Sequence, residues 1–403
     1  MKLASPGTPQ LTYCTNIHPG ESWPEVRRVL AGAVPAVKAA VAAQAPFGVG
    51  LRLSAAAAAA LAEPTALAEL QSLLAERQLY VFTLNGFPYG AFHGTRVKEA
   101  VYAPDWRSAD RIRYSTALAE ILAALLPADG GYGSVSTVPG AFRPHATTPA
   151  DRQAIAGGVI DHVAALMAIE ERTGRCIRLA LEPEPWCVLE TVADTVDFFG
   201  AHLFSTAAAR RLAAATGRTE TASAAALRRH LGVCFDACHM AVEFEDAEDA
   251  LARLAAAEID VVKVQVSAGM VARFGNGDDA AVLAALRTFA DDVYLHQVVE
   301  RRAGALRHWL DLPEALAAGA TDHAPREWRV HFHVPLFRRA LGVLESTQPW
   351  VVALLAALRR RAYGGHLEVE TYTWDVLPPE HRGEPVEHAI ARELAWVMGQ
   401  LAS

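Results

Sequence analysis

Short runs of aliphatic, β-branched and aromatic residues alternate with longer amphipathic stretches along almost the whole chain. The amphipathic stretches have the apolar spacing of helices, as in 22–43, 111–126 and 151–174. Alternation of strand and helix is typical of a parallel sheet covered by helices. Eight runs have the length and composition of strands, namely 11–18, 47–54, 79–85, 132–138, 176–182, 231–236, 261–267 and 366–371.

Eight such units predict a closed (β/α)8 TIM barrel. The alternative is an open doubly wound sheet, but its usual Gly-x-Gly-x-x-Gly turn does not follow the first run. Nothing resembles a linker, so we expect a single domain over 1–403. The seventh unit is oversized, and we expect an insertion or cap over 268–326, either covering an active site or without a role. A helix over 385–401 should follow the last strand.

Polar residues share one parity within the predicted strands. Because successive side chains of a strand point to opposite faces, the apolar parity should meet the helices and the polar parity should fill the barrel interior. A set of surface strands with solvated faces is the alternative, but strands of a barrel have no solvent face. Buried charges are costly unless they are paired or bind a cation, so a polar interior indicates function. The residues concerned include Cys14, Asn16, His18, Arg52, Ser54, Arg178, Glu182, Lys263, Gln265, Glu368 and Glu370.

Three carboxylates lie at the ends of predicted strands, where barrel enzymes carry their chemistry. They are Glu182 in LALEPEP, Asp236 in VCFDACH and Glu370 in LEVETYTW. Each alone could belong to a structural ion pair. Three at one mouth would repel one another unless a cation lay among them, so together they predict a divalent metal site. Gln265 could add a carbonyl oxygen.

Three histidines lie near these carboxylates in the predicted fold. His239 follows Asp236 by three residues, and His331 and His333 share a parity in RVHFHVP. A lone histidine is more often a satisfied polar residue than a ligand. An oxygen-rich site favours Mg²⁺ or Mn²⁺, whereas recruitment of His239 or His333 would favour Zn²⁺ or Co²⁺. We therefore expect one divalent ion, Mn, Mg or Zn.

Composition narrows the class of protein. Hydrophobic residues make up 52% of the 403 residues, charged residues 20%, and the net charge is −8. This is a globular composition, and the negative charge argues against a general nucleic-acid binder. We see no long apolar run and no apolar leader, so we expect a cytoplasmic protein without direct membrane insertion. Five cysteines without a CxxC pair fit the same compartment.

The segments LEPEP, FDACH, VKVQVS, HFHVPLF and AYGGHLEVET resemble the xylose isomerase-like barrel superfamily. That group includes sugar isomerases and epimerases, inosose-pathway enzymes and metal-dependent abasic-site endonucleases. Together with LTYCTNIHPGESW and LNGFPYGAFHG, the chain more closely resembles the metabolite traffic protein EboE family. That bacterial family is encoded beside other ebo genes and is associated with moving a small metabolite out of the cytoplasm.

The superfamily resemblance implies metal carboxylates at Glu182, Asp236 and Glu370. The histidine that usually completes the site falls on Gln265, a departure that weakens the expected site. The His-Pro-Gly turn of the endonucleases reads Val-Pro-Gly at 138–140, so a trinuclear zinc nuclease is not expected.

Two functions follow from the resemblance. The first is an isomerase- or epimerase-like, metal-dependent enzyme acting on a small polar metabolite. The second is a non-catalytic carrier or assembly factor with a degenerate metal site, for which other ebo-cluster proteins would be the partners. The substitution at Gln265 is the feature that separates the two functions. In the enzyme, the catalytic residues would be Glu182, Glu370, His239 and His333, and the substrate-binding residues would be His18, Arg52, Lys263 and His331.

Overall fold

The computed structural model describes residues 1–275, 277–319, 322 and 324–402. Its centre is a sheet of eight parallel strands in the order β1-β14-β7-β6-β5-β4-β3-β2, as the alternating pattern predicts. The predicted pairing of the first strand with the last barrel strand is confirmed. The strands are β1 (Gln10–Tyr13), β2 (Phe47–Arg52), β3 (Leu79–Asn85), β4 (Tyr132–Thr137), β5 (Cys176–Leu181), β6 (Leu231–Asp236), β7 (Val261–Val266) and β14 (His366–Val369).

The barrel closes between β1 and β2. The two strands share a parallel bridge between Cys14 and Gly50. The Thr12 hydroxyl reinforces it, because Oγ1 donates to the Gly48 carbonyl at 2.7 Å and accepts from the Gly50 amide at 2.9 Å. The first strand is shorter than predicted: it ends at Tyr13 and passes into a 3₁₀ turn, η1 (Thr15–Ile17). The strand parity predicted for Asn16 and His18 is therefore wrong.

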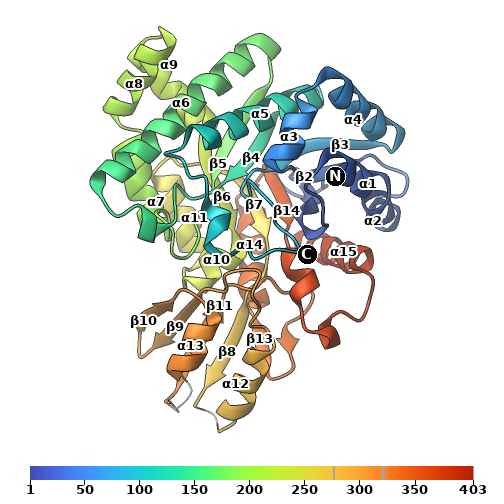
Figure 1. Cartoon of the computed structure of the whole chain (residues 1–403), viewed down its shortest axis with the longest axis vertical. Coiled ribbons are helices and arrows are strands. Elements are labelled where there is room, and N and C mark those ends of the chain that lie inside the picture. The colour runs from blue at the N-terminus through green and yellow to red at the C-terminus, as the bar shows by residue number, and fades with distance from the viewer. Residues whose placement is uncertain (276, 320–321, 323, 403) are drawn as a thin grey trace.

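Helices surround the barrel, as Figure 1 shows. Several begin at a side-chain cap, such as Thr148 before the long helix that precedes β5. The predicted C-terminal helix is confirmed. The helices of the barrel are α1 (Trp23–Ala31), α2 (Ala33–Val41), α3 (Ala55–Leu61), α4 (Pro64–Glu76), α5 (Ala109–Leu125), α6 (Pro149–Thr173), α7 (Val192–Phe198), α8 (Thr206–Thr216), α9 (Glu220–His230), α10 (Ala237–Val242), α11 (Ala247–Ala256), α14 (Gln348–Arg360) and α15 (Val386–Ala402).

A charged pair occupies the barrel interior. Lys263 Nζ lies 2.6 Å from Glu368 Oε2, and both side chains are 0% exposed. Gly50 makes room for this pair, because a Cβ there would lie 2.0 Å from Glu368 Oε1 and 2.6 Å from the Tyr13 carbonyl. The apolar parity, for example Ile177 and Leu179 of β5, is buried in the main hydrophobic core. The predicted division of the strand residues into two faces is correct for these strands.

The insertion or cap expected after β7 forms a second sheet. It is antiparallel, has six strands in the order β10-β9-β11-β8-β13-β12, and stands away from the barrel with two helices (Figure 1). It extends to Ser346, further along the chain than the 268–326 segment. Its elements are β8 (Met270–Phe274), α12 (Asp279–Arg287), β9 (Val298–Arg302), β10 (Ala305–Trp309), α13 (Leu312–Gly319), β11 (Arg326–Val330), β12 (Ala340–Leu341) and β13 (Leu344–Ser346).

The chain leaves and re-enters the barrel at one point. Ala268 follows β7, and its carbonyl accepts a hydrogen bond from the Val334 amide at 2.8 Å. The Gly269 carbonyl accepts from the Thr347 amide in the same way. The residues that follow β11, His331 and His333 among them, are thereby brought to the end of β7 although more than sixty positions separate them along the chain.

Among the described residues one helix, α6, is long and apolar enough to cross a membrane by length and composition, although no long apolar run was expected from the sequence. In the structure α6 packs on β5 and against α5 and α8, and 56% of its most apolar window is buried. A core helix of a barrel has the same properties, so this is weak evidence for a span.

Candidate metal centre

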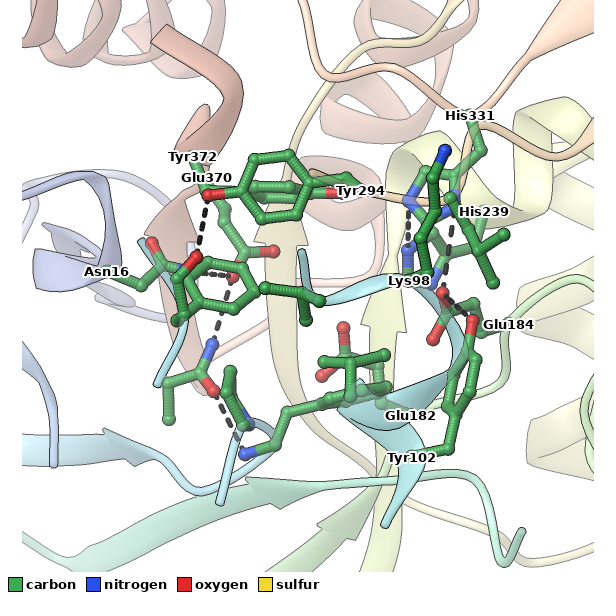
Figure 2. A pocket seen from close by; sticks show the side chains of 17 residues that line it. Asn16, Lys98, Tyr102, Glu182, Glu184, His239, Tyr294, His331, Glu370 and Tyr372 are labelled. Atoms are coloured by element: carbon green, nitrogen blue, oxygen red, sulfur yellow. Dashed lines mark hydrogen bonds and ion pairs between the residues drawn. The ribbon is translucent and has the colours of Figure 1, made fainter. Parts of the chain in front are cut away.

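The site lies at the carboxyl ends of the barrel strands. Glu182 follows β5, Asp236 ends β6, and Glu370 follows β14. Glu182 and Glu370 line one pocket, and Asp236 lies close enough to raise the pKa of both. The structure therefore brings the three carboxylates together at the mouth, at exposures of 3%, 0% and 5% in chain order. Figure 2 shows Glu182 and Glu370 pointing into the pocket.

The electrostatics of the three carboxylates are unfavourable without a cation. Burial, then Glu370 and Asp236, raise the pKa of Glu182 well above its usual value. Burial, then Asp236 and Glu368, do the same to the pKa of Glu370. The buried Lys263 opposes both shifts, but its ammonium group is held by Glu368. Carboxylates in such surroundings either bind protons or share a metal ion.

Asp236 and Glu370 are held rigidly. Asp236 Oδ1 accepts from the His239 amide at 3.0 Å and from the Ser267 hydroxyl at 2.7 Å. Glu370 Oε1 accepts from the side-chain amides of Asn16 at 2.7 Å and Asn85 at 2.9 Å. Each carboxylate thus has one oxygen fixed by protein donors, which orients the whole group.

At the mouth, three of the buried carboxylate and imidazole atoms in the described part of the chain lack a hydrogen-bond partner: Glu182 Oε2, Asp236 Oδ2 and His333 Nε2. Unpaired buried oxygens of carboxylates are costly, and each such atom calls for an explanation. Two carboxylate oxygens and an imidazole nitrogen are ligands that divalent metals accept. The residues present therefore fit a divalent ion at this place.

His333 is oriented as a ligand. Its Nδ1 donates to the Glu370 backbone carbonyl at 2.7 Å, which leaves Nε2 as the lone-pair nitrogen. Burial lowers the pKa of His333 to about 4, so the ring is neutral near pH 7. Asp236, His239 and His333 each offer a ligand atom within 4.8 Å of the other two. A metal-binding histidine normally has this backbone hydrogen bond on its other nitrogen.

Gln265 does not take the place predicted for it. Its register puts it beside Asp236 and Glu368. Its Oε1 accepts a hydrogen bond from the Cys234 thiol at 3.2 Å. The carbonyl oxygen is thus occupied by a protein donor, so the interpretation of Gln265 as a ligand is corrected. The long insertion returns His333 to the end of β7 and so places an imidazole near Asp236.

Three residues predicted to bind substrate lie elsewhere. Lys263 is paired with Glu368 inside the barrel, below the mouth. Arg52 donates to Glu21 Oε2 at 2.8 Å and to the Gly20 carbonyl at 3.1 Å. None of His18, Arg52 and Lys263 lines the pocket. Each of the three has a partner within the protein, which for His18 is the Tyr13 hydroxyl, and these three substrate-binding predictions are corrected.

His239 and His331 do line the pocket. Both are buried, and their Nε2 atoms lie 3.1 Å apart (Figure 2). His239 lies in α10, and His331 follows β11 of the insertion. The prediction that they act on a substrate stays a prediction, now with a suitable location.

Sequence reasoning missed several pocket residues. Asn16 and Asn85 orient Glu370, and the pocket is also lined by Lys98, Tyr102 and Glu184. Glu184 shares the parity of Glu182, which was a usable signal. Asn85 ends β3, within a predicted strand. Asn16, Lys98 and Tyr102 lie in 3₁₀ turns, where strand parity carries no information.

Aromatic side chains and a paired lysine form the outer wall. Tyr294 from the insertion packs against Phe92 and Tyr372, at ring-centroid distances of 5.1 Å in each case. Lys98 Nζ lies 2.6 Å from Asp311 Oδ2 and 3.0 Å from the Asp291 carbonyl. The loop after β3 and the insertion therefore close over the pocket together.

Solved structures share this fold. No protein-family model matches the chain, and no curated protein sequence matches it. A xylose isomerase-like TIM barrel protein from Mycobacterium smegmatis in complex with magnesium matches with a TM-score of 0.50 and 14% identity, covering 99% of this chain and 98% of that one. The chain has a xylose isomerase-like fold. Two further matches are D-allulose 3-epimerase from Methylomonas sp. (TM-score 0.47, 12% identity, 99% and 100% coverage) and the zinc-bound IOLI protein (0.45, 13%, 98% and 98%).

Proposed function

We propose that this chain is a metal-dependent enzyme that moves a proton on a small, neutral polyhydroxylated substrate, in the manner of sugar isomerases and epimerases. The observation that carries the proposal is the set of buried ligand atoms without partners at the mouth of the barrel. A binding pocket without metal would need donors for Glu182 Oε2 and Asp236 Oδ2, and the described residues supply none to these two atoms.

The ion would be held by Glu182, Asp236, Glu370 and His333. When bound, a divalent ion at this position polarises a carbonyl or hydroxyl oxygen of the substrate. The Mycobacterium smegmatis protein of similar fold was solved with magnesium. One imidazole among oxygen ligands also suits Mn²⁺ or Zn²⁺.

The side chains of the protein have separable roles in this proposal. Glu182 lies on the pocket floor, where a buried carboxylate can accept a proton from the carbon next to a carbonyl. Glu370 faces the pocket from β14 with one oxygen held by Asn16 and Asn85, which leaves its other oxygen for an ion or a proton. His239 and His331 can hold a substrate hydroxyl on the side of the insertion.

The charge of the pocket favours a neutral substrate. Lys98 is the one Lys or Arg side chain among the described lining residues, and Asp311 neutralises it. An anionic substrate would face Glu182, Glu184 and Glu370 without a free cation of the protein. Tyrosine and phenylalanine rings in the wall suit the apolar faces of a sugar ring or cyclic polyol.

Proton exchange with solvent tests the proposal. Protein loaded with Mg²⁺ or Zn²⁺ is incubated in D₂O with neutral ketoses such as D-fructose and with cyclic ketopolyols, and ¹H NMR follows loss of the proton next to the carbonyl. We expect exchange with wild type and none with Glu182→Gln. Glu393→Gln, the same change at a buried carboxylate outside the pocket, should exchange normally.

The alternative is a carrier that binds a metabolite without transforming it. A closed pocket is compatible with transport, and the resemblance to the EboE family favours metabolite traffic with other ebo-cluster proteins as partners. The five cysteines are buried and unpaired, which fits work in the cytoplasm. Saturable binding of a ketose by metal-loaded protein, with no exchange, would replace the enzyme proposal by this one.

A further inference from the structure

The pocket at the mouth of the barrel is too small for a sugar in this structure. Its free space is about 60 Å³. An engineered protein cavity of about 150 Å³ holds benzene, which has as many non-hydrogen atoms as a triose. A substrate of the class proposed above therefore enters the pocket only if part of the wall moves.

The outer wall consists of two segments that are far apart along the chain. One is the loop after β3 (86–102). The other is residues 290–297 of the insertion, here called the strap, which lies between α12 and β9 and is neither helix nor strand. Irregular segments at the mouth of a barrel commonly move during binding. The lining residues from the two segments are Phe87, Pro88, Phe92, Val97, Lys98, Val101 and Tyr102 of the loop and Tyr294 and Leu295 of the strap.

The loop after β3 is held by the barrel. Glu21 Oε1 accepts a hydrogen bond from the Phe92 amide at 2.7 Å. Arg52, at the end of β2, donates to the Gly90 carbonyl. These contacts tie the middle of the loop to the barrel independently of the insertion, so the loop is the fixed side of the wall.

The strap meets this loop along a seam with few contacts. The Val293 carbonyl accepts from the Val97 and Lys98 amides at 2.8 and 2.9 Å. The Tyr294 hydroxyl donates to the Phe92 carbonyl at 2.9 Å. The apolar side chains at the seam form a small cluster apart from the main hydrophobic core. A segment held by a small separate cluster and a few hydrogen bonds opens at a lower free energy than the core of a domain.

Lys98 is strained at the point where it meets the strap. Its φ is +38°, in the left-handed region that residues with a side chain disfavour. Its Nζ lies 2.6 Å from Asp311 Oδ2 and donates to the Asp291 carbonyl at 3.0 Å, and both of these residues belong to the insertion. Separation of the strap from the loop would release this conformation.

We propose that residues 290–295 form a gate, which swings away from the loop after β3 to admit a ligand and closes again with Tyr294 against Phe92 and Tyr372 (Figure 2). His296 marks the hinge, because its Nδ1 donates to the His331 carbonyl at 3.0 Å and holds that end of the strap in place. The class of molecule that passes the gate rests on the proposed function, whereas the opening itself does not.

A disulfide across the seam tests the gate without metal or substrate. Phe87→Cys adds a thiol to the pocket wall, while the five native cysteines are buried. Mass spectrometry follows its reaction with iodoacetamide, with and without an oxidised Val97→Cys, Val293→Cys pair. We expect the closed disulfide to slow labelling of the pocket thiol by roughly tenfold or more, because it blocks local opening. An oxidised Arg301→Cys, Leu306→Cys pair, which joins β9 to β10 and does not cross the seam, should leave the labelling rate unchanged.

A variant without an added bond covers failure of the disulfide to form. Tyr294→Ala removes a hydrogen bond and two ring contacts from the seam and should raise the labelling rate by roughly tenfold. Tyr80→Ala, at the opposite end of β3, should not raise it. Labelling that is equally fast in the locked and unlocked proteins, or unchanged by Tyr294→Ala, would overturn the gate.

Chelation separates the gate from the proposed function. We expect EDTA to remove Mn²⁺ from the locked protein roughly tenfold more slowly than from wild type, because the ion lies behind the same wall. Equal rates of removal would overturn the gate. Wild type that binds no Mn²⁺, while the disulfide still suppresses thiol labelling, would refute the proposed function and support the gate.

Discussion

The buried Lys263–Glu368 pair gives a sharp test of how the barrel interior is built. Both side chains are completely buried, their charged atoms are 2.6 Å apart, and the next polar neighbour of Lys263 is the Ser136 hydroxyl at 3.4 Å. Lys263→Met leaves the Glu368 carboxylate buried without a cation. Removing one partner of such a pair typically costs about 3–5 kcal/mol.

The assay is urea unfolding followed by circular dichroism. We expect Lys263→Met to lose about 3–5 kcal/mol, and the double variant Lys263→Met, Glu368→Leu to regain most of it, because no charge is then stranded. Arg210→Met breaks an exposed pair with Glu220 and should stay within about 1 kcal/mol of wild type. If Lys263→Met is as stable as Arg210→Met but binds its ligand more weakly, the structural role of Lys263 is refuted. Lys263 would then be a substrate-binding residue, as the sequence predicted.

Other predictions concern the frame of the mouth and its ion. Burial raises the pKa of Glu393 from 4.5 to about 7 while its Oε1 accepts from the Leu336 amide and the Thr371 hydroxyl. A carboxyl whose pKa is raised in the folded state lowers the free energy of unfolding as pH rises from 4.5 to 7, by roughly 3 kcal/mol at most. Glu393→Gln should therefore unfold at a higher temperature than wild type at pH 8 and at a similar temperature at pH 4.5. A difference in melting temperature that is the same at both pH values would contradict this reasoning. Gly50→Ala should lower the melting temperature measured by calorimetry, because its Cβ meets Glu368, and unchanged stability would mean that the pair can move aside. Chelation of metal from wild type should lower the melting temperature, and an unchanged value would argue that the carboxylates are protonated instead.

Much of the fold was predictable because the local composition of each strand distinguishes it from the helices around it. Seven predicted strands end within two residues of the observed ones. The carboxylates Glu182, Asp236 and Glu370 were identifiable because parallel strands bring their carboxyl ends to one edge, whatever lies between them. The first strand was overextended because η1 continues with residues that look like strand formers.

The sequence named His333 as a candidate but could not show how it reaches the carboxylates. His333 reaches the end of β7 because the second sheet returns the chain to Ala268, a tertiary relation with no local signal. The same holds for Lys263 and Arg52. The strand parity of Lys263 and Arg52 correctly predicted that their side chains point inward. Whether such a buried cation contacts a substrate or another side chain depends on residues from distant strands and loops.

The proposed function depends on one divalent ion among Glu182, Asp236, Glu370 and His333. Its most direct test is a crystal structure of the protein grown with Mn²⁺ or Zn²⁺, with anomalous data collected at the metal edge. We expect an anomalous peak within about 2.0–2.3 Å of oxygens of the three carboxylates and of His333 Nε2. An ordered crystal with no peak among these residues at saturating metal would contradict it.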